Sequence, residues 1–114
     1  MRRFGAATVL AACALALTAC GGGGGGTGSA TVQGNAASGA RVFASAGCSG
    51  CHTLAAADAH GNTGPNLDDL KPGFDEVKRQ VENGGGAMPS FRDTLTDQQI
   101  ANVAAYVSQN AGKG

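Results

Sequence analysis

The chain has 114 residues, which is enough for one small domain. Eight Lys and Arg residues balance eight Asp and Glu residues, and no cluster of basic side chains could neutralise a run of phosphates. Length, composition and charge therefore exclude a multidomain enzyme, a polytopic membrane protein and a coiled coil. They also argue against nucleic acid as a partner.

Residues 1–19 have the pattern of a bacterial export signal. Arg2 and Arg3 form a short basic region, and the apolar stretch that follows is shorter than the roughly 20 residues of a membrane-spanning helix. It ends in the sequence LTAC at positions 17–20, which resembles the lipobox of bacterial lipoproteins. That resemblance implies cleavage before Cys20 and acylation of this cysteine. The alternative is an ordinary secreted protein in which Cys20 is a free thiol.

Seven of the twenty glycines lie between Gly21 and Gly28. Such a run has no side chains to pack and a maximal backbone entropy cost, so residues 20–35 are predicted to be a lipidated cysteine and a flexible tether. The folded domain is then residues 36–114. It holds fifteen large apolar side chains in about 79 residues, which is few for a domain of this size.

Three helices are predicted in the domain. Ser38 is expected to cap the first, over about residues 39–46, and apolar side chains at helical spacing predict a second over residues 74–83. The sequence TDQQ at positions 96–99 matches a capping box and begins the last helix. Residues 53–70 are expected to be largely loop, and no segment has the alternation of a β-strand.

The sequence CSGCH at positions 48–52 is the motif that carries chemistry. Two thiols three residues apart can each add to one vinyl group of a haem, and His52 is then placed where its imidazole can ligate the iron. A thioredoxin-like redox pair, half of a zinc site and a disulfide are the alternatives. The first requires a βαβ pattern, and the second requires two further ligands where only His60 is left over.

Further motifs extend this interpretation. GPNL follows at positions 64–67, and Met88-Pro89 precedes the last helix. In this order, the first helix, CxxCH, GPNL and the Met-Pro pair resemble the class I, small monohaem cytochromes c over residues 36–109. The resemblance implies a small all-α cytochrome c fold, with three or more short helices wrapped around one covalently bound haem c. It also implies that the first and last helices cross closely at Gly39.

The resemblance implies roles for individual residues. The cofactor-binding residues that it implies are Cys48, Cys51, His52, Pro65, Leu67 and Met88. His52 and Met88 are the two iron ligands, and the Pro65 carbonyl accepts a hydrogen bond from the other ring nitrogen of His52. Met88 also lies beside the glycines at positions 84–86, where no helical stripe requires an apolar side chain. The alternative is that Met88 only fills a gap.

A haem would supply the apolar centre that the chain lacks, so we expect the haem-free chain to be largely unfolded. The implied function is single-electron transfer between Fe(II) and Fe(III) by an electron carrier that is not an enzyme. We expect a monomer, lipid-anchored at the outer face of the bacterial cytoplasmic membrane. Its redox protein partners would be a donor such as a quinol–cytochrome c reductase and a terminal oxidase or reductase.

Other functions stay open. The chain could be a fixed haem subunit of a larger redox complex, or an enzyme. The enzyme would be either a thiol–disulfide oxidoreductase that uses Cys48 and Cys51 or a weak haem peroxidase in which Met88 leaves the iron.

The charges of the domain argue against docking through a ring of lysines. Without Arg2 and Arg3, six basic and eight acidic residues remain, a net charge of −2. His60 is expected to be exposed, and the carboxylates of Asp58, Asp68 and Asp69 are expected to form a solvated face.

Overall fold

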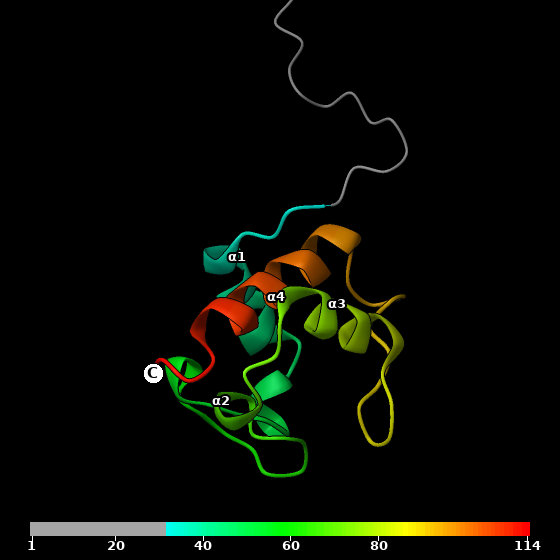
Figure 1. The fold of residues 1–114 in the computed structure, drawn as a ribbon. Coiled ribbons are helices and arrows are strands. Elements are labelled where there is room, and N and C mark those ends of the chain that lie inside the picture. The colour runs from blue at the N-terminus through cyan, green and yellow to red at the C-terminus, as the bar shows by residue number, and fades with distance from the viewer. Residues whose placement is uncertain (1–31) are drawn as a thin grey trace, which may run out of the picture. The chain divides into compact units, whose positions relative to one another are not determined.

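The structure of the protein, a computed structural model, describes residues 32–114 (Figure 1). Its elements are α1 (Ala36–Ser45), η1 (Cys48–Gly50), β1 (Thr53–Leu54), η2 (Ala55–Ala57), β2 (Ala59–His60), α2 (Leu67–Leu70), α3 (Phe74–Asn83) and α4 (Asp97–Asn110). The expected all-α fold class is confirmed. The predicted signal peptide, Cys20 and most of the predicted tether lie outside the described residues.

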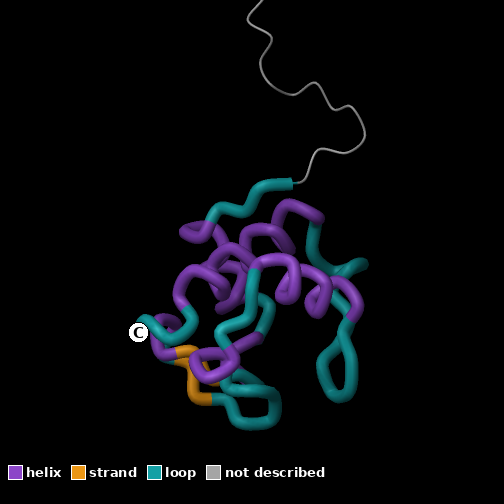
Figure 2. Tube along the Cα trace, in the orientation of Figure 1, coloured by secondary structure: helices purple, strands orange, loops and turns teal. Residues whose placement is uncertain are grey.

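Helices α1, α3 and α4 pack together, and long loops extend from them on one side (Figure 2). Within the described residues, no helix is both long and apolar enough to cross a bilayer. The core is formed by side chains from all three helices and from β1. Its most deeply buried large side chains are Phe43, Leu54, Ile100 and Val103.

The first helix starts earlier than predicted. Asn35, not Ser38, is its N-cap, and the Asn35 side chain accepts a hydrogen bond from the Ser38 backbone at 2.9 Å. Both residue types are good caps, so local preference alone does not separate them. A contact with α4 favours Asn35 as the cap, because the Asn35 backbone N–H donates to the buried Asn102 side chain at 2.8 Å.

The segment just before α1 is also attached to α4. Gln98 of α4 donates to the Gln33 carbonyl at 2.8 Å, and a Cβ on Gly34 would overlap with the backbone of Ala101. Residues 33–35 were expected to belong to the flexible tether. That expectation is wrong for these residues, because they hydrogen-bond to α4 and pack on it.

Helices α1 and α4 cross as the resemblance implies. At Gly39 the two backbones are so close that a Cβ would overlap with the Asn102 carbonyl. One turn later the rings of Phe43 and Tyr106 meet edge to face, with centroids 5.8 Å apart and an interplanar angle of 65°. Glycine is therefore required at position 39 for the two helices to approach this closely.

The boundaries of the other two long helices follow local signals. α4 begins with the predicted capping box, in which the side chains of Thr96 and Gln99 each accept a hydrogen bond from the other residue's backbone. α3 spans the predicted residues and ends at Gly84, whose φ of 68° favours glycine. Both predictions are confirmed.

Residues 53–70 contain more regular structure than the predicted loop. β1 and β2 pair antiparallel, with Thr53 opposite His60 and Leu54 opposite Ala59. Each strand has two residues, which is too short for an alternating pattern to be visible in the sequence. α2 is one helical turn, capped by Asn66, whose side chain accepts hydrogen bonds from the backbone N–H groups of Asp68 and Asp69.

Asp68 on α2 links separate segments of the chain through its carboxylate. Its carboxylate accepts hydrogen bonds from the Ala55 N–H at 2.8 Å and from the Gly112 N–H at 2.7 Å. Asp68 is not buried, which agrees with the expected solvated face, but its carboxylate also joins three segments of the chain, a role that was not predicted. His60 is exposed as expected, and its Nε2 lies 2.9 Å from the exposed Asp58 carboxylate.

Candidate functional site

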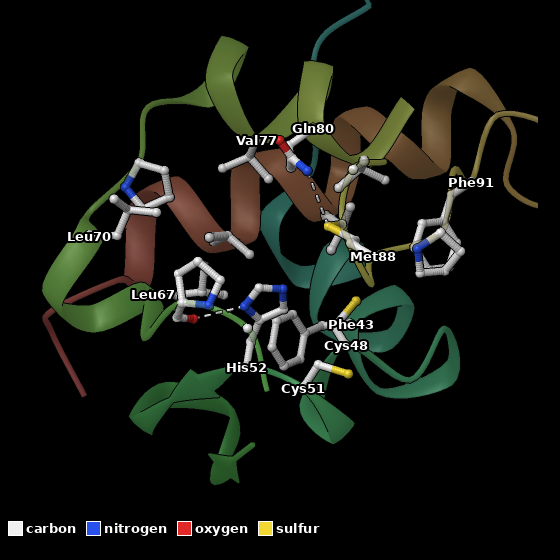
Figure 3. Close-up of a pocket in the computed structure, with 18 of the residues that line it drawn as sticks. Phe43, Cys48, Cys51, His52, Leu67, Leu70, Val77, Gln80, Met88 and Phe91 are labelled. Carbon is white, nitrogen blue, oxygen red and sulfur yellow. Dashed lines mark hydrogen bonds between the residues drawn. The ribbon is translucent and has the colours of Figure 1, made fainter. Parts of the chain in front are cut away.

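A cavity of about 380 Å³ opens between the helices and the two loops that follow η1 and α3 (Figure 3). Its wall is mostly apolar and includes Phe43 from α1, Val77 from α3 and Val103 from α4. All six residues that the resemblance implies for cofactor binding line this one cavity: Cys48, Cys51, His52, Pro65, Leu67 and Met88. Cys20 lies outside the described residues.

The CxxCH motif forms one tight turn. The Cys48 carbonyl accepts hydrogen bonds from the N–H groups of Cys51, at 3.2 Å, and His52, at 3.0 Å. This 3₁₀ turn explains why the spacing matters, since it directs two thiols and one imidazole to the same cavity. The small Gly50 in the turn has no atoms within 4 Å of where a Cβ would lie.

The orientation of His52 is fixed by the GPNL segment. Its Nδ1 lies 2.8 Å from the Pro65 carbonyl oxygen, which can only accept a hydrogen bond, so Nδ1 carries the proton. In the neutral ring the Nε2 lone pair is then free for a ligand. Gly64 packs on the imidazole so closely that a Cβ there would lie 2.6 Å from Cε1. The contact at position 64 therefore requires glycine, whereas position 65 contributes its backbone carbonyl.

Met88 approaches the cavity from the opposite wall (Figure 3). It lies at the end of a short hairpin turn, in which Met88 and Gly85 exchange two backbone hydrogen bonds of 2.9 and 3.0 Å. The half-buried Met88 side chain contacts Gln80 of α3, whose amide Nε2 donates to Sδ at 3.7 Å. A thioether and an imidazole nitrogen thus face each other across an apolar cavity.

Gln80 is a site residue that the sequence analysis did not identify. It lies three residues after Val77, so it shares the helix face that meets the cavity. The spacing of Val77 and Gln80 can be seen in the sequence. The hydrogen bond from Gln80 to Met88 could not be predicted from the sequence, because it depends on how the hairpin folds back beside α3.

The two thiols of the motif are free in the structure and differ in exposure. Cys48 is half-buried and Cys51 is exposed. Burial raises the pKa of the Cys48 thiol, against a lowering by a hydrogen bond within the residue, and the neighbouring Cys51 adds to the rise. A reactive redox cysteine needs a lowered pKa, so the environment of Cys48 does not favour its thiolate.

These donors fit a haem c. The cavity combines an imidazole nitrogen with a free lone pair, a thioether sulfur on the opposite wall, and the two free thiols of the CxxCH motif. Its mostly apolar wall suits a porphyrin plate. Within the described residues, no three His, Cys, Asp or Glu side chains cluster as a metal site would require.

Known proteins resemble this chain over the same residues. Residues 34–107 match the family described as cytochrome C oxidase, cbb3-type, subunit III. Cytochrome c6 of Limnospira maxima is 42% identical over 89 residues, which cover 71% of this chain and 99% of that protein. Cytochrome c6 of Gloeothece citriformis is 40% identical over 85 residues, covering 71% of this chain and 76% of that protein.

A solved structure supports the same assignment. The c-type cytochrome SorU from Sinorhizobium meliloti is 49% identical, with a TM-score of 0.64, over 68% of this chain and 91% of that chain. The match is close in sequence as well as in fold. Together, these relatives and the cavity imply one covalently bound haem c.

Proposed function

The chain belongs to the cytochrome c family, among the class I monohaem c-type cytochromes, and from this premise we propose that it carries single electrons between redox proteins. When bound, the haem supplies a reversible one-electron couple between Fe(III) and Fe(II). The observation that carries the proposal is that His52 and Met88 face one cavity beside the two thiols of the motif.

Each site residue has a part in this function. Cys48 and Cys51 would hold the haem through thioethers, and His52 and Met88 would ligate its iron. Pro65 holds the His52 ring in one orientation through its carbonyl. Leu67, which is almost fully buried, closes the wall of the cavity beside His52. If both His52 and Met88 ligate the iron, no position would be left for a substrate, which favours a carrier over an enzyme.

Potentiometric titration of the purified holoprotein tests the carrier function. We expect one reversible one-electron wave, with a low-spin absorption spectrum in both oxidation states. Peroxidase activity should be near zero and should rise in Met88→Ala, because that variant opens an iron position. Appreciable peroxidase activity in the unmutated protein would favour the enzyme instead.

Alkylation of the native holoprotein separates the carrier from a thiol–disulfide oxidoreductase. Cysteines bonded to haem through thioethers cannot react, so we expect no labelling of Cys48 or Cys51 by iodoacetamide. Labelling of the exposed Cys51 in the native protein would contradict thioether attachment. The denatured holoprotein is the control, because thioethers survive unfolding and the result should not change.

A fixed subunit of a redox complex is the second candidate. It is favoured by the family match, because that family is described as a subunit of an oxidase. Detergent extraction followed by size separation distinguishes the two. A mobile carrier elutes as a monomer of the mature chain, whereas a fixed subunit co-purifies with larger partners.

We also propose that Cys20 anchors the domain to the outer face of the bacterial cytoplasmic membrane. The export signal and the lipobox-like LTAC at positions 17–20 support this. Several acyl chains on one cysteine would give durable membrane attachment. Cys20→Ser should move the protein from the membrane fraction to the soluble fraction. A wild-type protein that is already soluble would contradict the anchor and leave the electron-transfer proposal intact.

A further inference from the structure

The loop that carries Met88 also caps the C-terminal end of α3. The last carbonyls of a helix have no partner within the helix and must find one outside it. In α3 the Val81 carbonyl accepts from the Phe91 N–H at 2.9 Å, and the Glu82 carbonyl accepts from the Ser90 hydroxyl at 2.5 Å. Both donors come from the segment just after Met88. The end of the helix and the position of the loop are thus fixed by the same hydrogen bonds.

The two sides of the loop differ in how they can be held. On the side before Met88, residues 84–86 are glycines with φ values of 68°, 155° and 58°, so they offer no side chain to fasten the loop. On the other side, Ser90 and Arg92 both reach the last turn of α3. The Arg92 Nη2 donates to the Asn83 side chain at 2.8 Å.

The contacts of Arg92 are of unequal weight. Its second contact, with the Glu82 carboxylate, is 3.9 Å long, and the Arg92 side chain is 60% exposed. An exposed ion pair of this kind contributes little. The neutral hydrogen bond from the Ser90 hydroxyl is shorter and satisfies a backbone carbonyl that has no other described partner. Ser90 therefore makes the main side-chain contact between the Met88 loop and α3, and Arg92 makes a secondary one.

We propose that Ser90, assisted by Arg92, is a positioning residue that holds Met88 in the cavity against replacement by an external ligand. The inference rests on the proposed function, in which Met88 is the distal iron ligand. In the exchange, the sulfur of Met88 leaves the iron and a nitrogen of the incoming ligand takes its place, with no change in oxidation state. Weaker attachment of the loop favours that exchange, because fewer loop hydrogen bonds then oppose the movement of Met88 away from the iron.

Imidazole titration of the oxidised holoprotein measures this hold directly. Ser90→Ala should bind imidazole roughly two- to tenfold more tightly than the wild type, which corresponds to the loss of one hydrogen bond. Ser90→Thr keeps the hydroxyl and should return to the wild-type affinity. Arg92→Gln should shift the affinity in the same direction by a smaller factor.

Ser108→Ala is the matched control. The Ser108 hydroxyl also donates to a helix carbonyl, that of Ala105 at 3.2 Å, but it lies on α4 and not on the loop. If Ser90 acts only through global stability, Ser90→Ala and Ser108→Ala should bind imidazole with the same affinity when each is measured at the same interval below its melting temperature. Equal affinities would overturn the inference.

The same experiment keeps the two proposals apart. Before imidazole is added, the oxidised wild type should show the weak long-wavelength absorption band of a methionine sulfur on ferric haem. If that band is absent, the proposed role of Met88 fails. If the band is present and Ser90→Ala behaves as Ser108→Ala does, only the role of Ser90 fails.

Discussion

The crossed helix pair and the two loops around the cavity are stabilised in different ways. In the α1–α4 pair the contacts are apolar and close, with Phe43, Ile100 and Val103 at most 2% exposed. In the loops the contacts are hydrogen bonds to backbone groups, such as His52 to Pro65 and Ser90 to Glu82. The iron ligands proposed here all come from the loops, whereas the helices supply the wall behind them.

This difference shows how a small core can support a large cofactor. The helix pair makes its contacts directly, mainly through the close approach at Gly39 and through apolar side chains. Apart from Leu54 and Leu67, the loops bury few large apolar side chains, so an apolar plate between them would supply most of the apolar contact that they lack. Changes at the α1–α4 crossing should therefore alter stability, whereas changes to residues that line the cavity should alter haem binding and its chemistry.

The largest effect is expected when the haem cannot be attached. We expect Cys48→Ala/Cys51→Ala, prepared without haem, to be largely unfolded and to lack a cooperative thermal transition by circular dichroism. Any remaining hydrogen-exchange protection should lie in α1 and α4, not in the loops. Native-like helicity with a cooperative melt would contradict this prediction.

The next largest effect is expected at the helix crossing. Gly39→Ala places a Cβ where the Asn102 carbonyl lies, so it should destabilise the holoprotein by about 3 kcal/mol. Gly73→Ala is the matched control, since that Cβ would have no atom within 4 Å. Denaturant unfolding measures both. If the two alanines have the same effect, close approach of the backbones is not what Gly39 provides.

A smaller effect is expected on the reduction potential. The Gln80 amide donates to the Met88 sulfur and draws electron density from it, which makes the sulfur a poorer donor to Fe(III). Gln80→Leu should therefore lower the potential, on the order of 40 mV if one hydrogen bond is lost. Gln109→Leu, an exposed change on α4, should leave the potential unchanged. A rise in potential in Gln80→Leu would contradict the assigned direction.

The smallest effect concerns acid stability. Hydrogen bonds from the Gly112 and Ala55 N–H groups lower the pKa of Asp68. The folded state therefore binds fewer protons than the unfolded state near the ordinary pKa of an aspartate. The stabilisation is fully present above that value and is lost as the pH falls through the folded pKa. The melting-temperature difference between wild type and Asp68→Asn should shrink with acidification, and a difference independent of pH would argue against this role.

Sequence patterns predicted those parts of the fold that local signals determine. The capping box of Thr96 and Gln99 and the apolar spacing of α3 are read from neighbouring residues, and both predictions hold. The start of α1 was missed because Asn35 and Ser38 are both good caps. The contact that separates them lies 67 residues away, on Asn102.

The site divides in the same way. The CxxCH spacing identified Cys48, Cys51 and His52, and the resemblance to the cytochromes c implied the Pro65 carbonyl as the partner of His52. Gln80 and Asp68 were missed as functional or structural partners. Their hydrogen bonds depend on how the chain returns to them, and for Asp68 the partner Gly112 lies 44 residues further on. Long-range polar contacts of this kind leave no periodic pattern in a sequence.

The absorption spectrum of the purified, oxidised holoprotein tests the central claim most directly. If one haem c is held between His52 and Met88, the spectrum is low-spin and contains the long-wavelength band of methionine ligation. That band should disappear in Met88→Ala and persist in Ser108→Ala. A high-spin wild-type spectrum without the band would contradict the claim that these two loops hold the iron between them.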